Sequence, residues 1–171
     1  LDQYVGPEGN LLDLYEKQCN RIYLPSPVLS IKEMAALKNM DAVQPEWTSV
    51  TIDITFEHSE GEAGYERTLD RVCAEVSQAI KDNHKIVVLS DRNVSESRVA
   101  ISSLIACGGV HHYLIRNKQR SSITLVVETA EAREVHHVCV MVGYGADAIC
   151  PWLAQEAVMK VGREGLSKKD L

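Results

Sequence analysis

Ile86-Val-Val-Leu89 and Ile123-Thr-Leu-Val-Val127 are two short and almost uninterrupted apolar runs. Runs of this kind are typical of parallel strands that are buried on both faces. A β-branched stretch at residues 50–56 precedes them and an apolar stretch at 146–149 follows, so we expect four strands. Helices are expected between these strands, over residues 62–81, 101–116 and 134–142. Because strands and helices alternate, the sequence predicts an α/β fold built on a parallel sheet.

The number of strands bears on the architecture. Four strands are half of what a closed (β/α)₈ barrel needs, and such a barrel takes about 250 residues. The pattern is therefore compatible with a partial (half) β/α barrel that belongs to something larger, or with an open doubly wound sheet. The residues alone leave both alternatives open.

The chain divides into two expected parts. Residues 1–48 read as an N-terminal arm, because Gly6-Pro7-Glu8-Gly9 is typical of a turn. Ser30 and Glu33 have the spacing of a capping box, which predicts a short helix over 31–38. Residues 49–171 then form the predicted βαβαβαβ unit.

Composition excludes several classes of function. With 45% apolar and 25% charged residues, the chain has enough material for a core. Its net charge of -6 argues against a nucleic-acid partner, which would require clustered Lys and Arg. No apolar run approaches the roughly 20 residues of a membrane span, and no signal peptide opens the chain. The five cysteines form no C-x-x-C pair and are interpreted as buried thiols of a reducing compartment, so we expect a cytoplasmic location, with a plastid as the alternative.

Charged side chains gather where the predicted strands end. Functional residues of parallel α/β folds cluster at the carboxyl ends of the strands. Glu57 and His58 follow the first predicted strand. Six further residues stand at or just beyond the ends of the second and third strands: Asp91, Arg92, Glu128, Glu131, Arg133 and His136. They could perform acid–base chemistry in a stand-alone small α/β enzyme, or form ion pairs that tie loops together or face another domain.

Motifs for metals and cofactors are absent from the sequence. His111-His112 and His136-His137 are adjacent pairs, whereas helical zinc sites place their histidines four positions apart. No glycine-rich phosphate loop and no G-x-S-x-G motif occur. We therefore expect no metal site and no bound cofactor in this chain.

Several longer motifs resemble one known family. They are Leu89-Ser-Asp-Arg92, Val110-His-His-Tyr-Leu-Ile-Arg116, Leu125-Val-Val-Glu-Thr-Ala-Glu-Ala-Arg-Glu-Val-His-His137, Gly143-Tyr-Gly-Ala-Asp-Ala-Ile149 and the opening Tyr4-Val-Gly-Pro-Glu-Gly-Asn-Leu-Leu12. In these motifs the chain resembles the central domain of the large subunit of glutamate synthase (GOGAT), and its form looks eukaryotic. The resemblance implies a partial β/α barrel, a reduced copy of the family's flavin barrel that carries no flavin.

The resemblance also implies a function. Enzymes of this family produce two glutamates from glutamine, 2-oxoglutarate and reductant. The chain would then be an internal structural and coupling domain that links the amidotransferase and FMN-binding synthase domains of the same polypeptide. It would hold no complete active site and no catalytic residue of the family, and it would be inactive alone. FMN and a 3Fe-4S cluster would belong to the parent enzyme, with FAD and NAD(P)H in an associated reductase part, and the six strand-end residues would be interface or coupling candidates.

Overall fold

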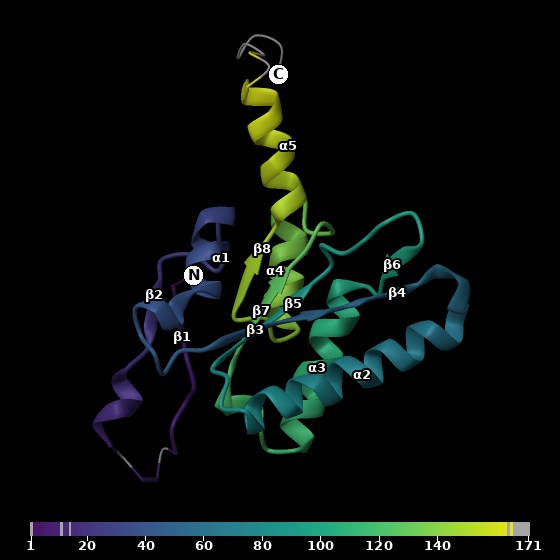
Figure 1. The fold of residues 1–171 in the computed structure, drawn as a ribbon. Helices are drawn as coiled ribbons and strands as arrows, with labels where there is room; N and C mark the ends of the chain where they lie inside the picture. Colours follow the sequence, from purple (N-terminus) through teal and green to yellow (C-terminus); the bar gives the residue numbers. More distant parts are fainter. Residues whose placement is uncertain (1, 11, 14, 164, 166–171) are drawn as a thin grey trace.

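A parallel sheet forms the centre of the computed structural model, which describes residues 2–10, 12–13, 15–163 and 165. Its four strands follow the order β3 (Ser49–Asp53), β5 (Ile86–Ser90), β7 (Thr124–Glu128) and β8 (Ala148–Cys150) (Figure 1). All three neighbouring pairs are parallel, which confirms the prediction of an α/β fold with a partial β/α barrel arrangement. The predicted outer limits, residues 1 and 171, lie outside the described residues.

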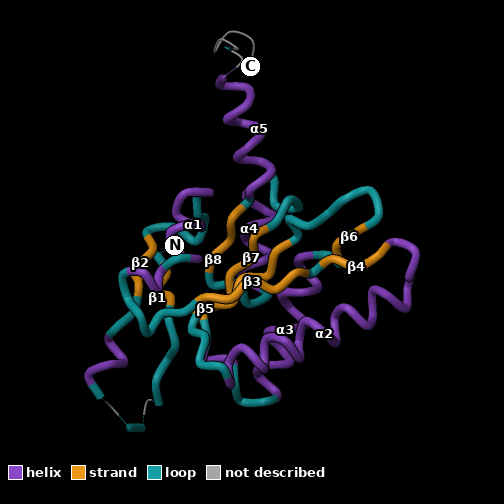
Figure 2. The backbone as a smooth tube through the Cα atoms, viewed as in Figure 1, coloured by secondary structure: helices purple, strands orange, loops and turns teal. Residues whose placement is uncertain are grey.

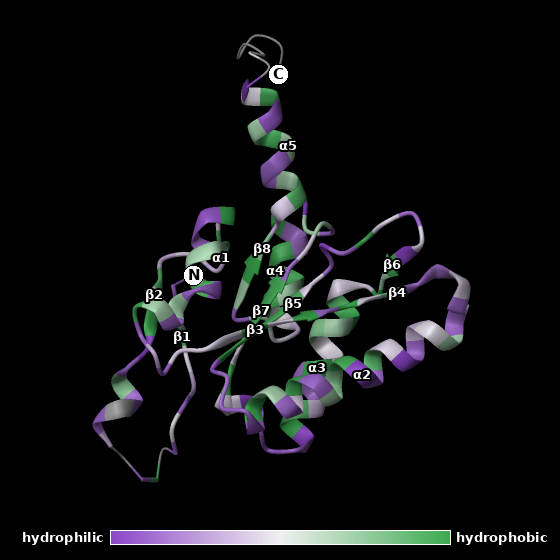
Figure 3. Cartoon of the chain, in the orientation of Figure 1, coloured by the Kyte–Doolittle hydropathy of each residue, from purple (hydrophilic) through white to green (hydrophobic). Residues whose placement is uncertain are grey.

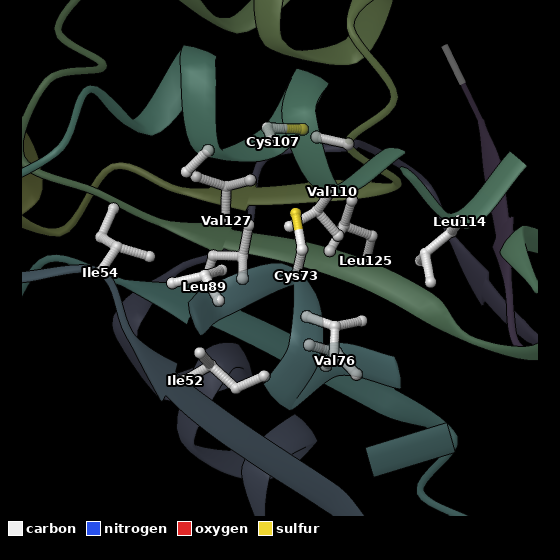
Figure 4. Close-up of a cluster of buried hydrophobic side chains, with 14 of the residues drawn as sticks. Ile52, Ile54, Cys73, Val76, Leu89, Cys107, Val110, Leu114, Leu125 and Val127 are labelled. Carbon is white, nitrogen blue, oxygen red and sulfur yellow. The ribbon is translucent and has the colours of Figure 1, made fainter. Parts of the chain in front are cut away.

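Helices cover one face of this sheet. They are α2 (Gly61–Lys81), α3 (Ser103–Arg116) and α4 (Val135–Gly143), each within two residues of its predicted bounds (Figure 2). Figure 4 shows how their side chains meet those of the strands: Val76 and Val110 point toward Leu89 and Leu125, and all four are fully buried. Burying such a branched side chain stabilises a fold by about 1.5–3 kcal/mol, so this layer is a major source of stability.

The N-terminal segment covers the other face. Helix α1 (Ile31–Lys38) begins with the predicted capping box, in which Ser30 Oγ accepts from Glu33 N at 3.2 Å and Glu33 Oε2 accepts from Ser30 N at 2.7 Å. Met34 and Trp47 are buried in one apolar cluster with Val88. Since successive strand residues point to opposite faces, Val88 joins this cluster while Leu89 joins the helix-covered one. The division at residue 48 stays a prediction, but the segment before it supplies four of the nine buried residues of this second cluster.

The same segment also lies along an edge of the sheet. Ile149 N donates to Pro27 O at 2.7 Å, and Leu29 N donates to Ile149 O at 2.8 Å, so residues 27–29 extend beside β8. Upstream, β1 (Gln3–Val5) and β2 (Ile22–Leu24) form an antiparallel pair that the sequence did not indicate. Short 3-10 turns complete the chain: η1 (Glu16–Cys19), η2 (Met40–Ala42), η3 (His58–Glu60) and η4 (Arg120–Ser122).

The strand predicted at residues 50–56 is wrong in its extent. β3 ends at Asp53, and a separate strand β4 (Thr55–Glu57) pairs antiparallel with β6 (Arg98–Ala100). The cause is Arg98, whose Nε donates to Thr55 Oγ1 at 3.0 Å and whose Nη1 donates to Glu57 Oε1 at 2.8 Å. Glu57 and His58 therefore do not stand at the carboxyl end of the parallel sheet, and Asp53 does.

Helix α5 (Trp152–Arg163) starts directly after Pro151 and was not predicted. It projects away from the sheet in Figure 1, and Figure 3 shows hydrophilic and hydrophobic residues alternating along it. None of its described residues is buried. In the part of the chain that the structure describes, no helix is both long enough and apolar enough to cross a membrane.

Candidate functional site

Glu128 is the centre of a polar network at the carboxyl ends of the strands. The register places Glu128, the last residue of β7, beside Ser90, the last residue of β5. Glu128 Oε2 accepts from Lys38 Nζ at 2.7 Å and from Ser90 Oγ at 2.7 Å, while Oε1 accepts from Arg92 Nε at 2.9 Å. The Glu128 side chain is only 4% exposed. One buried carboxylate thus joins three separate parts of the chain.

The charge of Glu128 is stabilised by its partners. Burial alone would raise the pKa of its carboxyl group, but the hydrogen bonds from Lys38, Ser90 and Arg92 outweigh burial and lower that pKa. For Arg92, burial opposes the charge, yet Glu128 and Glu156 raise the pKa of the guanidinium. Glu128 is therefore ionised at neutral pH, with both oxygens engaged. As a carboxylate it has no proton to donate, and each of its oxygens already accepts a hydrogen bond within the protein.

Helix α5 is anchored to this network through its first residues. The guanidinium of Arg92 lies 4.5 Å from the ring centre of Trp152, and Arg92 Nη1 pairs with Glu156 Oε1 at 3.1 Å. Trp152 Nε1 donates to Asp91 Oδ1 at 2.7 Å. Stacking of a guanidinium on an indole adds cation–π attraction to the hydrogen bonds. We name this set the carboxyl-edge network; its members are Lys38, Ser90, Asp91, Arg92, Glu128, Trp152 and Glu156.

Thr129 joins the network to the start of α3. Asp91 Oδ2 accepts from Thr129 Oγ1 at 2.9 Å, and Ser103 Oγ lies 2.7 Å from the same Thr129 oxygen. Glu131 Oε2 accepts from Ser103 N at 2.8 Å. This carboxylate binds an amide at the first turn of α3, where the helix dipole favours negative charge. Glu131 is therefore a helix-capping residue in this structure.

Arg133 and His136 lie apart from the buried network. Both are exposed, and together with Glu131 they line a cavity of about 390 Å³ beside α4. Asp91, Arg92 and Glu128 are absent from the lining of this cavity. The six predicted residues thus separate into three that bond within the carboxyl-edge network and three that line the cavity, and Thr129 connects Asp91 of the first group to Glu131 of the second.

Sequence reasoning missed several members of the site. Lys38 and Trp152 come from segments that no strand-end argument reaches, since one ends α1 and the other starts α5. Asp53 could have been found, because it is the one charged residue in the stretch 50–56. Asp53 Oδ2 accepts from Asn93 Nδ2 at 3.0 Å and pairs with Arg98 at 3.5 Å. Through these contacts Asp53 links the end of β3 to the loop after β5 and to β6.

The cysteines divide by exposure. Cys73, Cys107 and Cys150 are buried as predicted, and burial raises the pKa of Cys107 to about 12 and that of Cys150 to about 11. The prediction is wrong for Cys19 and Cys139, which are exposed. Among the described residues, no group of three or more His, Cys, Asp or Glu side chains is arranged to hold a metal ion.

These features define a class: a parallel α/β domain in which the carboxyl edge of the sheet is held together by ion pairs around one buried carboxylate. Its strand-end charges bind one another and the flanking helices α1 and α5. A free acid–base pair, which the reading as a stand-alone enzyme needs, does not occur in the carboxyl-edge network.

The chain belongs to the family of glutamate synthase central domains, whose model matches residues 1–171. It is 51% identical over 168 residues to the NADH glutamate synthase of Schizosaccharomyces pombe, covering 98% of this chain and 8% of that protein. Identity to the NADPH glutamate synthase large chain of Bacillus subtilis is 38% over 151 residues, covering 88% of this chain and 10% of that protein. With the ferredoxin-dependent glutamate synthase of Spinacia oleracea it is 35% over 158 residues, or 91% of this chain and 10% of that protein. The higher identity to the yeast protein agrees with the predicted eukaryotic form, and the chain spans about a tenth or less of these relatives.

Proposed function

We propose that this chain is an internal structural and coupling domain of a glutamate synthase that converts glutamine, 2-oxoglutarate and reductant into two glutamates. Its partners would be the amidotransferase and FMN-binding synthase domains of the same polypeptide. FMN and the 3Fe-4S cluster would reside there, and FAD and NAD(P)H in an associated reductase part. The family membership and the small share of each relative that the chain covers support this proposal.

The single observation that carries the coupling role is the position of Glu128. It pairs with Lys38 at the end of α1, and Arg92 extends the chain of contacts to Glu156 on α5. An N-terminal helix and a C-terminal helix are thus joined through one buried carboxylate. A displacement of either helix must change this network, because each ion pair here depends on contact distances of 2.7–3.1 Å.

Arg133 offers a second contact of the same kind. Its side chain is exposed beside the cavity with His136, so it can pair with a carboxylate of a neighbouring domain. Interdomain charge pairs of this type set the register of two surfaces more than they add affinity.

The test is made in the full-length enzyme with the variants Glu128→Ala and Arg133→Ala. We expect both to raise the ratio of ammonia released to glutamate formed, because hydrolysis of glutamine then proceeds without delivery of its ammonia. Reduction of the flavin by the electron donor is expected to stay at the wild-type rate. Glu75→Ala is the control, since Glu75 forms only an exposed pair with Arg71 on α2. A ratio equal to that of the wild type in both variants would reduce these residues to fold-stabilising groups.

A further inference from the structure

A second charged cavity lies at the amino-terminal ends of the strands, on the opposite edge from the carboxyl-edge network. Its volume is about 420 Å³, within the range of small-molecule sites. One wall is the N-terminal segment, and the other is formed by α3 and the residues that lead into β7 and β8. Glu8 N donates to Ser121 O at 2.7 Å and joins the two walls. The charged or titratable lining residues are Glu8, Arg21, His111, Lys118, Arg120 and Asp147.

Two of these charged side chains, Arg120 and Asp147, bind each other and the backbone of the protein. Arg120 Nη2 lies 2.9 Å from both carboxylate oxygens of Asp147, and it also donates to Gly145 O at 2.9 Å. Arg120 Nη1 donates to Ile123 O at 3.1 Å. Arg120 and Asp147 thus neutralise each other and form the floor of the cavity.

Arg21 and Lys118 are not satisfied in the same way. Arg21 pairs with the exposed carboxylate of Glu8 at the long distance of 3.4 Å and its Nη2 donates to Tyr4 O at 2.6 Å, while its Nε is buried with no hydrogen-bond partner. The ammonium of Lys118 is exposed and makes no hydrogen bond or ion pair with any described residue. The cavity thus holds three cations against two carboxylates, an excess of one positive charge in a chain whose net charge is -6.

His111 adds a neutral donor to this wall. Its Nδ1 accepts from Arg120 Nε at 3.1 Å, which assigns the ring proton to Nε2. Burial and the neighbouring Arg120 lower the pKa of His111, so the ring is neutral near pH 7. A neutral imidazole in this tautomer donates one hydrogen bond and does not repel Arg120.

We propose that this cavity binds a small oxyanion, the carboxylate or phosphate group of a metabolite, between Lys118, Arg21 and His111. Charge-assisted hydrogen bonds from an ammonium and a guanidinium are the interactions that hold such groups most strongly. The excess positive charge supplies the attraction, and the bond of Arg21 to Tyr4 O holds its guanidinium at the cavity wall. Because both walls contribute donors, the bound anion also fastens the N-terminal segment to the connection between α3 and β7.

The test uses titration of the chain with inorganic phosphate at pH 7.5, with chloride keeping the ionic strength constant. Binding is followed by calorimetry and by the ¹⁵N shifts of the His111 ring. Acetate and succinate are titrated in parallel, which distinguishes a phosphate from a carboxylate ligand. We expect saturable binding of at least one probe, with a shift of the His111 Nε2 signal.

Lys118→Asn is the decisive variant. Lys118 has a positive φ of 55°, a conformation that Asn tolerates well, so the fold is retained. Loss of one charge-assisted contact weakens binding roughly tenfold. The control is Lys32→Gln, because Lys32 is an exposed lysine of α1 outside the lining of this cavity. Absence of saturable binding for all three probes, or equal affinity in Lys118→Asn and wild type, would overturn the proposal.

Discussion

Replacing Glu128 by Gln tests how much the carboxyl-edge network contributes to stability. The amide keeps the shape of the side chain but removes its charge, and its NH₂ group then faces donors. Lys38 Nζ and Arg92 Nε would lose the carboxylate that they contact at 2.7 and 2.9 Å. Removing one partner of a fully buried pair costs about 3–5 kcal/mol. The side chains of Lys38 and Arg92 are 28% and 34% exposed, so hydration recovers part of this loss and we expect about 2–3 kcal/mol.

Urea unfolding at pH 7 measures this loss. With a typical slope of about 2 kcal/mol per molar urea, the midpoint should fall by about 1–1.5 M. The matched control is Glu75→Gln, which breaks an exposed pair on α2 and should cost no more than about 0.5 kcal/mol. A loss for Glu128→Gln as small as that of the control would refute the assignment of Glu128 as the centre of the network.

The pH dependence of the same difference supplies a second check. The folded state lowers the pKa of Glu128, so its contribution is complete above the ordinary carboxyl value of about 4.3 and disappears as the pH falls through the folded pKa. Once protonated, Glu128 resembles the Gln of the variant. The difference in unfolding free energy between wild type and Glu128→Gln should therefore shrink below pH 4.3, and a constant difference down to pH 3 would contradict the ion-pair account.

Three further predictions use other parts of the structure. Trp152→Phe removes the donor to Asp91, a residue that is 3% exposed, and should lower the unfolding free energy by about 1–3 kcal/mol in urea titrations. Gly145→Ala should lower the melting temperature by several degrees, because φ is +106° and an added Cβ meets the His111 ring, whereas Gly143→Ala, which meets no atom within 4 Å, should be neutral or stabilising. A thiol reagent should modify two cysteines in the native protein and five in denaturant, and modification of a third native thiol would contradict the assignment; the two reactive residues are Cys19 and Cys139.

Local patterns were sufficient to predict the parallel strands. The runs at 86–89 and 123–127 are apolar at nearly every position, and only burial on both faces explains that. The prediction failed for residues 55–57, because they carry the same β-branched pattern as β3. Their pairing with β6 depends on Arg98, which lies 43 positions away from Thr55. The sequence also did not indicate that helix α1 covers the second face of the sheet. Met34 belongs to a helix of only eight residues whose apolar stripe is weak.

The candidate site was predictable to the extent that topology dictates it. Parallel strands end at one edge, so Asp91, Arg92 and Glu128 had to lie near one another. Their partners Lys38 and Trp152 come from elements outside the strand pattern, and nothing local indicates that these side chains reach the same carboxylates. Only the structure therefore shows that the charges of these strand-end residues are paired within the protein and are not free to react.

The contact of residues 27–29 with β8 and α5 has a consequence for synthesis of the protein. Leu29 O accepts from Gln155 Nε2, a partner 126 positions later in the chain. At about 5–20 residues per second, the ribosome adds that partner roughly 6–25 s after Leu29. During this interval, Leu29, Met34 and Trp47 lack the last strand that buries them. The nascent N-terminal segment therefore exposes apolar side chains until the last strand has emerged, and completion of this side of the core waits for translation to reach residue 155.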